Sequence, residues 1–126
     1  MPPSFNLRPL FAARWRPAWQ VLLALLVAAV SWLAFKPGEA DDTLAHLDKL
    51  RHIAAFLCMA GVASMASTAG PRAARSIALM LMVYGAFIEL VQSRIPTRSG
   101  SVGDLVADAL GIAAGLLLVH GLRKRS

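Results

Sequence analysis

Four long apolar runs constrain this chain more than any other feature of its sequence. They cover residues 18–35, 50–69, 73–92 and 104–122, and contain 18, 20, 20 and 19 residues. A helix that crosses a bilayer needs about 20 mostly apolar residues, within a range of about 17–25. The mean hydropathy of +0.59 and the charged fraction of 16% agree with such helices, since soluble domains average about 25% charged residues. The runs predict an all-α integral membrane four-helix bundle.

Glycine and proline mark three breaks between the runs. The breaks contain Pro37 and Gly38, then Gly70 and Pro71, and finally Pro96, Gly100 and Gly103. Residues of these types end helices and begin turns. The connections are too short for a second domain. We therefore predict a basic N-terminal segment over 1–17, a single four-helix domain over 18–122 and a basic C-terminus over 123–126.

Positive charge is distributed unequally between the two sides of the predicted bundle. One side carries both chain ends and the second connection, with eight cations and no acid. The other side carries five cations and most of the acids. Because loops rich in Lys and Arg stay in the cytoplasm, we predict that both termini are cytoplasmic and that the segment 93–103 faces outward. The lipid bilayer is the expected partner, and the plasma (inner) membrane is the expected location.

The basic composition and the apolar first run could also indicate a nucleic-acid-binding protein or a signal peptide, but the sequence favours neither. The net charge of +6 does not indicate nucleic-acid binding, because the cations sit at the edges of apolar runs without interleaved aromatic residues. Arginines followed by an apolar run resemble a signal peptide with a cleavage site at 38–40. The first run has 18 residues, however, and the apolar region of a signal peptide has about 7–15, so we expect a retained helix. The lone Cys58 excludes an internal disulfide.

Each of three helices is predicted to present a polar pair at its outer end. The pairs are Asp48 with His52, Glu89 with Gln92, and Asp104 with Asp108. Residues three or four positions apart share a helix face, so the three pairs can meet. Lys49 and Arg98 supply positive charge near the same level. We predict that these eight residues form one polar cluster near the outer face, where they are the candidates for ligand binding.

Small residues extend these faces away from the cluster. Gly85 lies four residues before Glu89, while Gly111 and Gly115 continue the face of Asp108 as a G-x-x-x-G pattern. Small residues at this spacing let membrane helices approach closely, so the acids are expected to face other helices. A charged group at the bilayer centre costs at least about 2.5–3.5 kcal/mol. The acids must therefore be paired or hydrated.

The predicted cluster permits three interpretations. With Arg51 and Arg94 counted, four acids and four cations lie in this region and could form an ion-paired clamp, for example through a contact of Arg98 with Glu89 or Asp104. A hydrated pocket for a polar headgroup or an antibiotic is the functional alternative. A metal site would use His52 with the neighbouring carboxylates, but one histidine without an H-x-x-x-H pattern is a weak indication. We therefore expect neither a metal nor a cofactor, and the sequence identifies no catalytic residue.

Two stretches of sequence and the four-helix layout resemble the VanZ-like family of small multi-pass membrane proteins. The segment DKLRHIAAF at 48–56 resembles the D-K-x-x-H motif that opens the family's second helix. The segment IELVQSRIPTRSGSVGDLVADALG at 88–111 resembles its E-x-x-Q, Arg and S-x-x-D motifs. Asp108 departs from the pattern, because the family usually has Asn there. The resemblance covers residues 48–115, which is about half of the chain.

The resemblance implies a role in the bacterial cell envelope, since the family is named after a protein that gives resistance to the glycopeptide teicoplanin. It implies no established catalytic residue, so a non-enzymatic protein is the first expectation. The alternative is a membrane-embedded enzyme that acts on a lipid-linked cell-wall or polysaccharide precursor, with His, Glu and Asp as acid–base groups. A small proton-coupled exporter is disfavoured because the first run contains no acid. The sequence leaves the ligand and the oligomeric state open.

Overall fold

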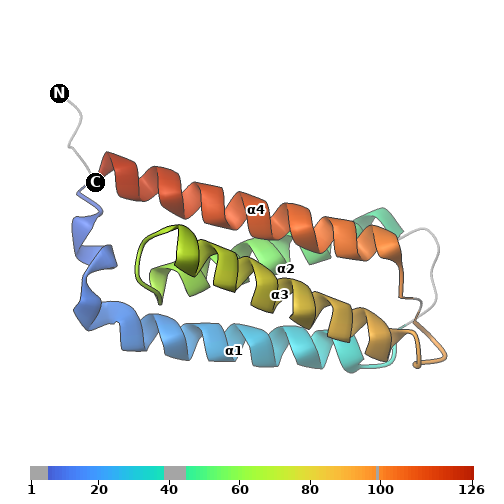
Figure 1. The fold of residues 1–126 in the computed structure, drawn as a ribbon. Helices are drawn as coiled ribbons and strands as arrows, with labels where there is room; N and C mark the ends of the chain where they lie inside the picture. The colour runs from blue at the N-terminus through green and yellow to red at the C-terminus, as the bar shows by residue number, and fades with distance from the viewer. Residues whose placement is uncertain (1–5, 39–44, 99) are drawn as a thin grey trace.

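Four α-helices make up most of the structure. The structure, a computed structural model, describes residues 6–38, 45–98 and 100–126. Two short 3-10 helices, η1 (Arg8–Phe11) and η2 (Ala13–Trp15), precede α1 (Arg16–Phe35), α2 (Ala45–Met65), α3 (Pro71–Gln92) and α4 (Val102–Arg125). The described residues contain no strand, so the predicted all-α four-helix architecture is confirmed (Figure 1).

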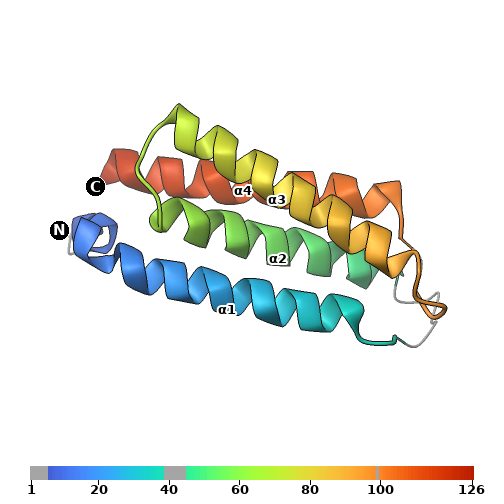
Figure 2. The ribbon, with the colours of Figure 1, turned by 60° about the horizontal axis from the view of Figure 1, so that its bottom comes forward.

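The four helices lie side by side, as Figures 1 and 2 show from two directions. The segment before α1 and the last turn of α4 share one end of the bundle, where the Arg123 guanidinium lies 5.5 Å from the centre of the Phe11 ring. The last turns of α1 and α3 and the first turns of α2 and α4 form the opposite end, which we call the polar end. The predicted polar residues lie at this second end.

Three helices are long and apolar enough to cross a membrane. They are Ala13–Phe35, Pro71–Gln92 and Val102–Arg125, with 23, 22 and 24 residues. This composition places the chain among membrane proteins. The helix α2, which replaces the second predicted run, is the exception, because Asp48, Lys49 and Arg51 fall within its first two turns. As α2 packs against α1, α3 and α4, its polar residues can face other helices rather than lipid.

The helix boundaries differ from the predicted runs mainly in α2. It begins at Ala45, five residues before the predicted run, and ends at Met65, four residues before its predicted end. Beyond this end the Ser67 hydroxyl donates to the Ala63 carbonyl oxygen at 2.7 Å. Serine and threonine side chains compete in this way with helical hydrogen bonding. Gly70, with a φ of 134°, then directs the chain into α3.

The remaining boundary differences place charged residues inside helices. α1 begins at Arg16 rather than at residue 18, with a proline in its first turn, where the missing N–H group has no cost. α4 continues to Arg125, so the basic segment predicted over 123–126 lies largely in its last turn. Cations there interact favourably with the carbonyl end of the helix dipole.

The closest helix pair is α2 with α4, and glycine makes it possible. A Cβ atom on Gly111 would lie 2.5 Å from the carbonyl oxygen of Ile53, and one on Gly115 would lie 2.5 Å from that of Leu57. Beside this contact, Phe56 and Met59 of α2 are almost completely buried. The predicted G-x-x-x-G face of α4 therefore lies against α2 and brings the two backbones together.

A polar contact between apolar helices fixes α1 against α3. The Tyr84 hydroxyl on α3 lies 2.6 Å from the Ser31 hydroxyl on α1 and donates to the Val27 carbonyl oxygen at 3.2 Å. Hydrogen bonds of this kind between helices help to hold membrane bundles together. With the α2–α4 contact, they set the position of all four helix ends at the polar end.

We predict that Gly111→Ala destabilises the bundle. Its methyl group would overlap the Ile53 carbonyl, and strain of this kind costs about 1–3 kcal/mol. Thermal melting of the purified protein in detergent measures the effect. Gly121→Ala is the matched control, because no heavy atom lies within 4 Å of the new Cβ position. Equal melting temperatures for the two variants would refute the packing assignment.

We also predict that both termini are cytoplasmic, because the arginines before α1 and in the last turn of α4 lie at the end of the bundle where the described residues include no acid. Reporter fusions after Lys124 and after Glu39, which lies outside the described residues, test this orientation. The fusion after Lys124 should report a cytoplasmic location and the fusion after Glu39 an external one. An external signal from the Lys124 fusion would show that the orientation is wrong.

Candidate functional site

His52 is the centre of the polar end. It lies in the second turn of α2, with its ring directed at α3 and α4. Its Nδ1 is 2.7 Å from Asp108 Oδ1, and its Nε2 is 3.9 Å from Glu89 Oε1. The His52 side chain is 10% exposed, that of Glu89 9% and that of Asp108 0%. One imidazole therefore lies between two buried carboxyl groups that come from different helices.

Glu89 also contacts the start of α4. Its Oε2 accepts a hydrogen bond from the Ser101 backbone N–H at 2.8 Å. Ser101 is the N-cap of α4, and its hydroxyl accepts a hydrogen bond from the Asp104 backbone N–H at 3.1 Å. A serine at this position satisfies an N–H group that has no partner within the helix. The start of α4 is thereby fixed against α3, and Asp104 is directed into the bundle.

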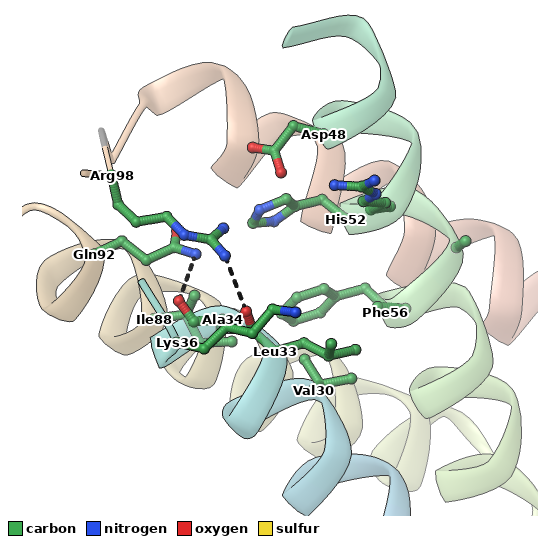
Figure 3. Close-up of a pocket in the computed structure, with 13 residues that line it drawn as sticks. Val30, Leu33, Ala34, Lys36, Asp48, His52, Phe56, Ile88, Gln92 and Arg98 are labelled. Carbon is green, nitrogen blue, oxygen red and sulfur yellow. Dashed lines mark hydrogen bonds between the residues drawn. The ribbon is translucent and has the colours of Figure 1, made fainter. Parts of the chain in front are cut away.

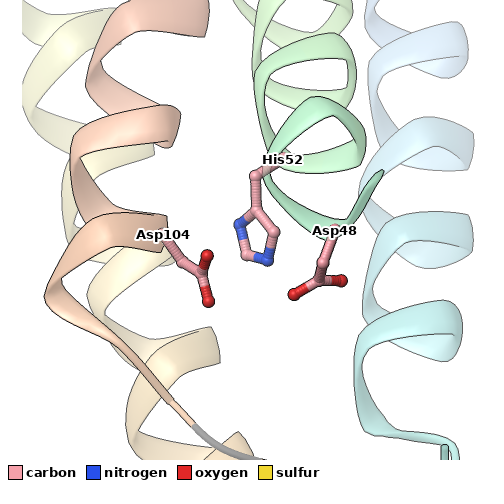
Figure 4. Close-up of side chains that lie close together, drawn as sticks. All are labelled: Asp48, His52 and Asp104. Carbon is pink, nitrogen blue, oxygen red and sulfur yellow. The ribbon is translucent and has the colours of Figure 1, made fainter. Parts of the chain in front are cut away.

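Asp104 and Asp48 lie on opposite sides of the His52 ring (Figure 4). These three residues each offer a potential ligand atom within 4.8 Å of the other two. Asp104 also lies 3.7 Å from Lys49 Nζ. Because the Lys49 side chain is 48% exposed, water weakens this ion pair. Lys49 therefore offsets only part of the negative charge at the polar end.

Each of the three buried carboxyl groups has at least one oxygen that accepts no hydrogen bond from the described part of the chain. Glu89 Oε1, Asp104 Oδ1 and Asp108 Oδ2 are buried and accept no hydrogen bond. Buried polar atoms in folded proteins usually have such a partner. An ion-paired clamp would supply a cation to each of these oxygens, whereas among the described residues only Asp104 Oδ1 has a lysine or arginine within ion-pair distance. This arrangement therefore differs from a closed network of matched charges.

The predicted contact of Arg98 with Glu89 or Asp104 is wrong. Among the described residues Arg98 forms no ion pair, and its Nη2 donates to the Leu33 carbonyl oxygen at 3.1 Å (Figure 3). Gln92 Nε2 likewise donates to the Ala34 carbonyl oxygen at 3.2 Å. The last carbonyl groups of a helix have no partner within it. Arg98 and Gln92 supply these partners and attach the end of α1 to α3 and to the segment that follows it.

A cavity of about 490 Å³ opens between α1, α2 and α3 at the polar end (Figure 3). Its interior is apolar and contains Val30, Leu33, Phe56 and Ile88. Charged and polar side chains also line it, and these are Lys36, Asp48, Arg51, His52, Gln92 and Arg98. An apolar cavity with a few converging polar groups is the usual form of a small-molecule site.

The structure brings the eight predicted residues to one end of the bundle in three groups. His52, Glu89 and Asp108 are at the centre, Asp48, Lys49 and Asp104 surround them, and Gln92 and Arg98 connect the cluster to α1. Sequence reasoning missed the contribution of α1, which supplies Lys36 and one wall of the cavity. The only signal was the position of Lys36 directly after the first apolar run.

The predicted packing glycine Gly85 lies against Asp108, since a Cβ there would be 2.6 Å from Oδ2.

Comparison with known proteins identifies a family for nearly the whole chain. The model of the family described as VanZ/LLP1 matches residues 4–123. The match includes all four helices and every residue of the polar cluster. It also extends the resemblance beyond the segment 48–115 that carries the motifs. No curated protein and no solved structure matches the chain.

We predict that Arg98→Ala destabilises the protein by about 1.5–3 kcal/mol, the usual contribution of a hydrogen bond to a charged group. The loss follows from freeing the Leu33 carbonyl at the end of α1. Thermal melting in detergent measures it, with Arg94→Ala as the control, because Arg94 precedes Arg98 on the same segment and is exposed. If both variants melt at the wild-type temperature, the contact with Leu33 does not stabilise the fold.

Proposed function

We propose, since the chain belongs to the VanZ/LLP1 family, that it binds the anionic headgroup of an envelope lipid at its polar end. In this proposal it is a multi-pass protein of the plasma (inner) membrane, and the polar end faces outward. Binding there would contribute to the handling of envelope precursors or to resistance against glycopeptides such as teicoplanin. The protein would act by binding rather than by catalysis.

The cavity between α1, α2 and α3 is the observation that carries this proposal. Lys36, Arg51 and Arg98 line it together with a single acid, Asp48. Arginine and lysine bind phosphate oxygens through charge-assisted hydrogen bonds. The net positive lining therefore suits an anionic phosphate group better than a neutral or cationic one.

The apolar interior of the cavity suits the remainder of a lipid. Val30, Leu33, Phe56 and Ile88 can hold hydrocarbon next to the point where the headgroup is bound. A soluble anion would use only the charged residues and leave this apolar surface exposed. Burial of hydrocarbon contributes about 25 cal/mol for each Å² removed from water. The combination of both surfaces favours an amphipathic ligand.

The orientation of the polar end connects this binding to the cell envelope. If both chain ends are cytoplasmic, as the positive-inside rule predicts, the cavity faces the outer surface of the membrane. Lipid-linked precursors of the cell wall or of polysaccharides would meet the protein there. Their phosphate-bearing headgroups and long hydrocarbon chains have the two properties that the cavity suits.

A second candidate function is supported by the contact of His52 with Asp108. A carboxylate that accepts the Nδ1–H of a histidine fixes its tautomer and leaves Nε2 available as a base. His52 also lines the cavity, so this base could act on a bound headgroup. Under this alternative the protein is a membrane-embedded enzyme that modifies the same class of lipid.

We predict that the Lys36→Gln/Arg51→Gln double variant binds anionic lipid at least about ten-fold more weakly than the wild type, because two phosphate-binding charges are lost. Native mass spectrometry of the protein in detergent measures binding of phosphatidylglycerol, phosphatidylcholine and inorganic phosphate. The wild type should prefer phosphatidylglycerol. Mass analysis of the recovered lipid separates the two functions, since an enzyme would change the mass of its substrate.

Arg94→Gln is the control for this experiment, because it removes an exposed charge outside the cavity. In cells, a deletion strain that expresses the wild type or Arg94→Gln should show the wild-type glycopeptide or other envelope phenotype. The strain that expresses the double variant should lack it, although immunoblots show equal amounts of protein in the membrane. Equal affinity of the wild type for phosphatidylcholine and phosphatidylglycerol would contradict the proposal. So would unchanged binding by the double variant.

A further inference from the structure

The negative charge buried at the polar end exceeds the positive charge placed beside it. Glu89, Asp104 and Asp108 are 7%, 3% and 0% exposed. In the described part of the chain, Lys49 is the only lysine or arginine that pairs with any of them. A buried carboxylate without a counter-charge is strongly disfavoured. A cation bound beside these carboxyl groups would offset the negative charge that lysine and arginine leave uncompensated there.

Two buried carboxyl oxygens, one on α3 and one on α4, have no hydrogen-bond partner. Glu89 Oε2 accepts a hydrogen bond from the Ser101 N–H. Glu89 Oε1 has no hydrogen-bond partner and lies 3.9 Å from His52 Nε2. Asp108 uses Oδ1 for His52 and leaves Oδ2 without a partner. Both side chains are more than nine-tenths buried. The free oxygens therefore belong to groups that water reaches poorly.

The contact with Asp108 also determines which nitrogen of His52 is free. A carboxylate accepts a hydrogen bond, so Nδ1 carries the proton in this pair. In the neutral ring this leaves the lone pair on Nε2, on the side of Glu89. Histidines that bind metals have the same arrangement, since their second nitrogen commonly donates to a carboxylate that orients the ring.

The distances fit a shared cation better than a direct hydrogen bond. The 3.9 Å between His52 Nε2 and Glu89 Oε1 is too long for a hydrogen bond. Two ligand atoms that are each about 2.0–2.2 Å from a tetrahedral zinc ion lie roughly 3.4 Å apart. His52, Glu89 and Asp108 each place a potential ligand atom within 4.8 Å of the other two. A small side-chain movement would bring His52 Nε2 and Glu89 Oε1 onto one ion, while Asp108 keeps its contact with Nδ1.

We propose that His52 Nε2 and Glu89 Oε1 bind one divalent transition-metal cation of the Zn²⁺ or Mn²⁺ class, and that Asp108 orients the imidazole through its contact with Nδ1. One imidazole nitrogen and carboxylate oxygens are suitable ligands for both ions. The sequence argued against a metal because it contains one suitably placed histidine and no H-x-x-x-H pattern. The fold brings suitable residues together from separate helices, because His52 comes from α2, Glu89 from α3 and the orienting Asp108 from α4.

A second set of three residues shares His52 but suits a cation less well. It consists of Asp48, His52 and Asp104 (Figure 4). Lys49 Nζ lies 3.7 Å from Asp104 in this set and would repel a metal ion there. Neither Glu89 nor Asp108 has a lysine or arginine within ion-pair distance in the described part of the chain. The set formed by His52, Glu89 and Asp108 is therefore the preferred one.

The proposed ion would lie next to the cavity, because its ligand His52 also lines the cavity. Two protein ligands, His52 and Glu89, leave coordination positions open for water or for an oxygen of a bound headgroup. The inference does not depend on the proposed lipid binding. Its test contains no lipid, so failure of either proposal leaves the other unaffected.

Metal content of the full-length protein tests the proposal. The protein is purified in detergent, treated with EDTA, dialysed against Zn²⁺ or Mn²⁺ and freed of excess ion before elemental analysis by mass spectrometry. We expect about one ion per wild-type chain. Loss of a ligand, or of the carboxylate that orients it, weakens metal binding about 10–100-fold. His52→Gln, Glu89→Gln and Asp108→Asn should therefore each reduce the affinity at least ten-fold.

Two matched controls keep the test specific. His120→Gln removes a histidine near the opposite end of α4, and Asp48→Asn removes an acid of the competing set; both should retain the ion. Circular dichroism verifies helicity, and Zn²⁺ should raise the melting temperature of the wild type but not that of Glu89→Gln. The proposal is overturned if the wild type binds no ion. It is also overturned if Glu89→Gln and Asp108→Asn retain the ion, or if Asp48→Asn alone loses it.

Discussion

The contact between His52 and Asp108 places two ionisable side chains inside a bundle of apolar helices, where an unpaired charge is costly. Much of the surrounding structure supports this contact. α2 and α4 must approach closely for the side chains to meet, and Gly111 and Gly115 allow this approach one and two turns beyond Asp108. Gly85 on α3 leaves room for the second oxygen of Asp108. Small residues therefore position the polar cluster as well as the helices.

The position of α2 explains how a less apolar helix is accommodated in a membrane protein. Its first turns carry Asp48, Lys49 and Arg51, which would be unfavourable in contact with lipid. The other three helices are long and apolar, and all of them pack against α2. They provide a protein environment in which His52 can face carboxyl groups rather than hydrocarbon. Attachment of the end of α1 by Arg98 and Gln92 closes this arrangement on the remaining side.

The sequence predicted those parts of the structure that depend on helical spacing. Asp48 with His52, and Asp104 with Asp108, are four residues apart, and this spacing placed each pair on one face of a helix. The all-α architecture and the polar end of the bundle followed from such local patterns. The end of α2 was predicted less well, because Ser67 and Thr68 are compatible with an apolar run but do not continue the helix.

The partners of Arg98 were not predictable in the same way. Charge alone favoured a contact with Glu89 or Asp104, whereas the structure pairs Arg98 with a carbonyl oxygen at the end of α1. That carbonyl is 65 residues away in sequence, and its need for a donor depends on where α1 ends in space. The cavity is equally a product of three helices that are distant in sequence. Its lining by α1 therefore became visible only in the folded chain.

The central claim is that the buried carboxyl groups are retained for binding and are not a clamp that holds the helices together. The melting temperature of the Glu89→Gln/Asp108→Asn double variant, measured beside the wild type in detergent with EDTA, tests it most directly. Both substitutions preserve size and can accept the hydrogen bonds from Ser101 and His52, while they remove buried charge that has no lysine or arginine partner among the described residues. A binding site maintained at the expense of stability predicts that the variant melts at or above the wild-type temperature. A loss of about 3–5 kcal/mol, as expected when a buried ion pair is broken, would contradict the claim and identify the cluster as a clamp.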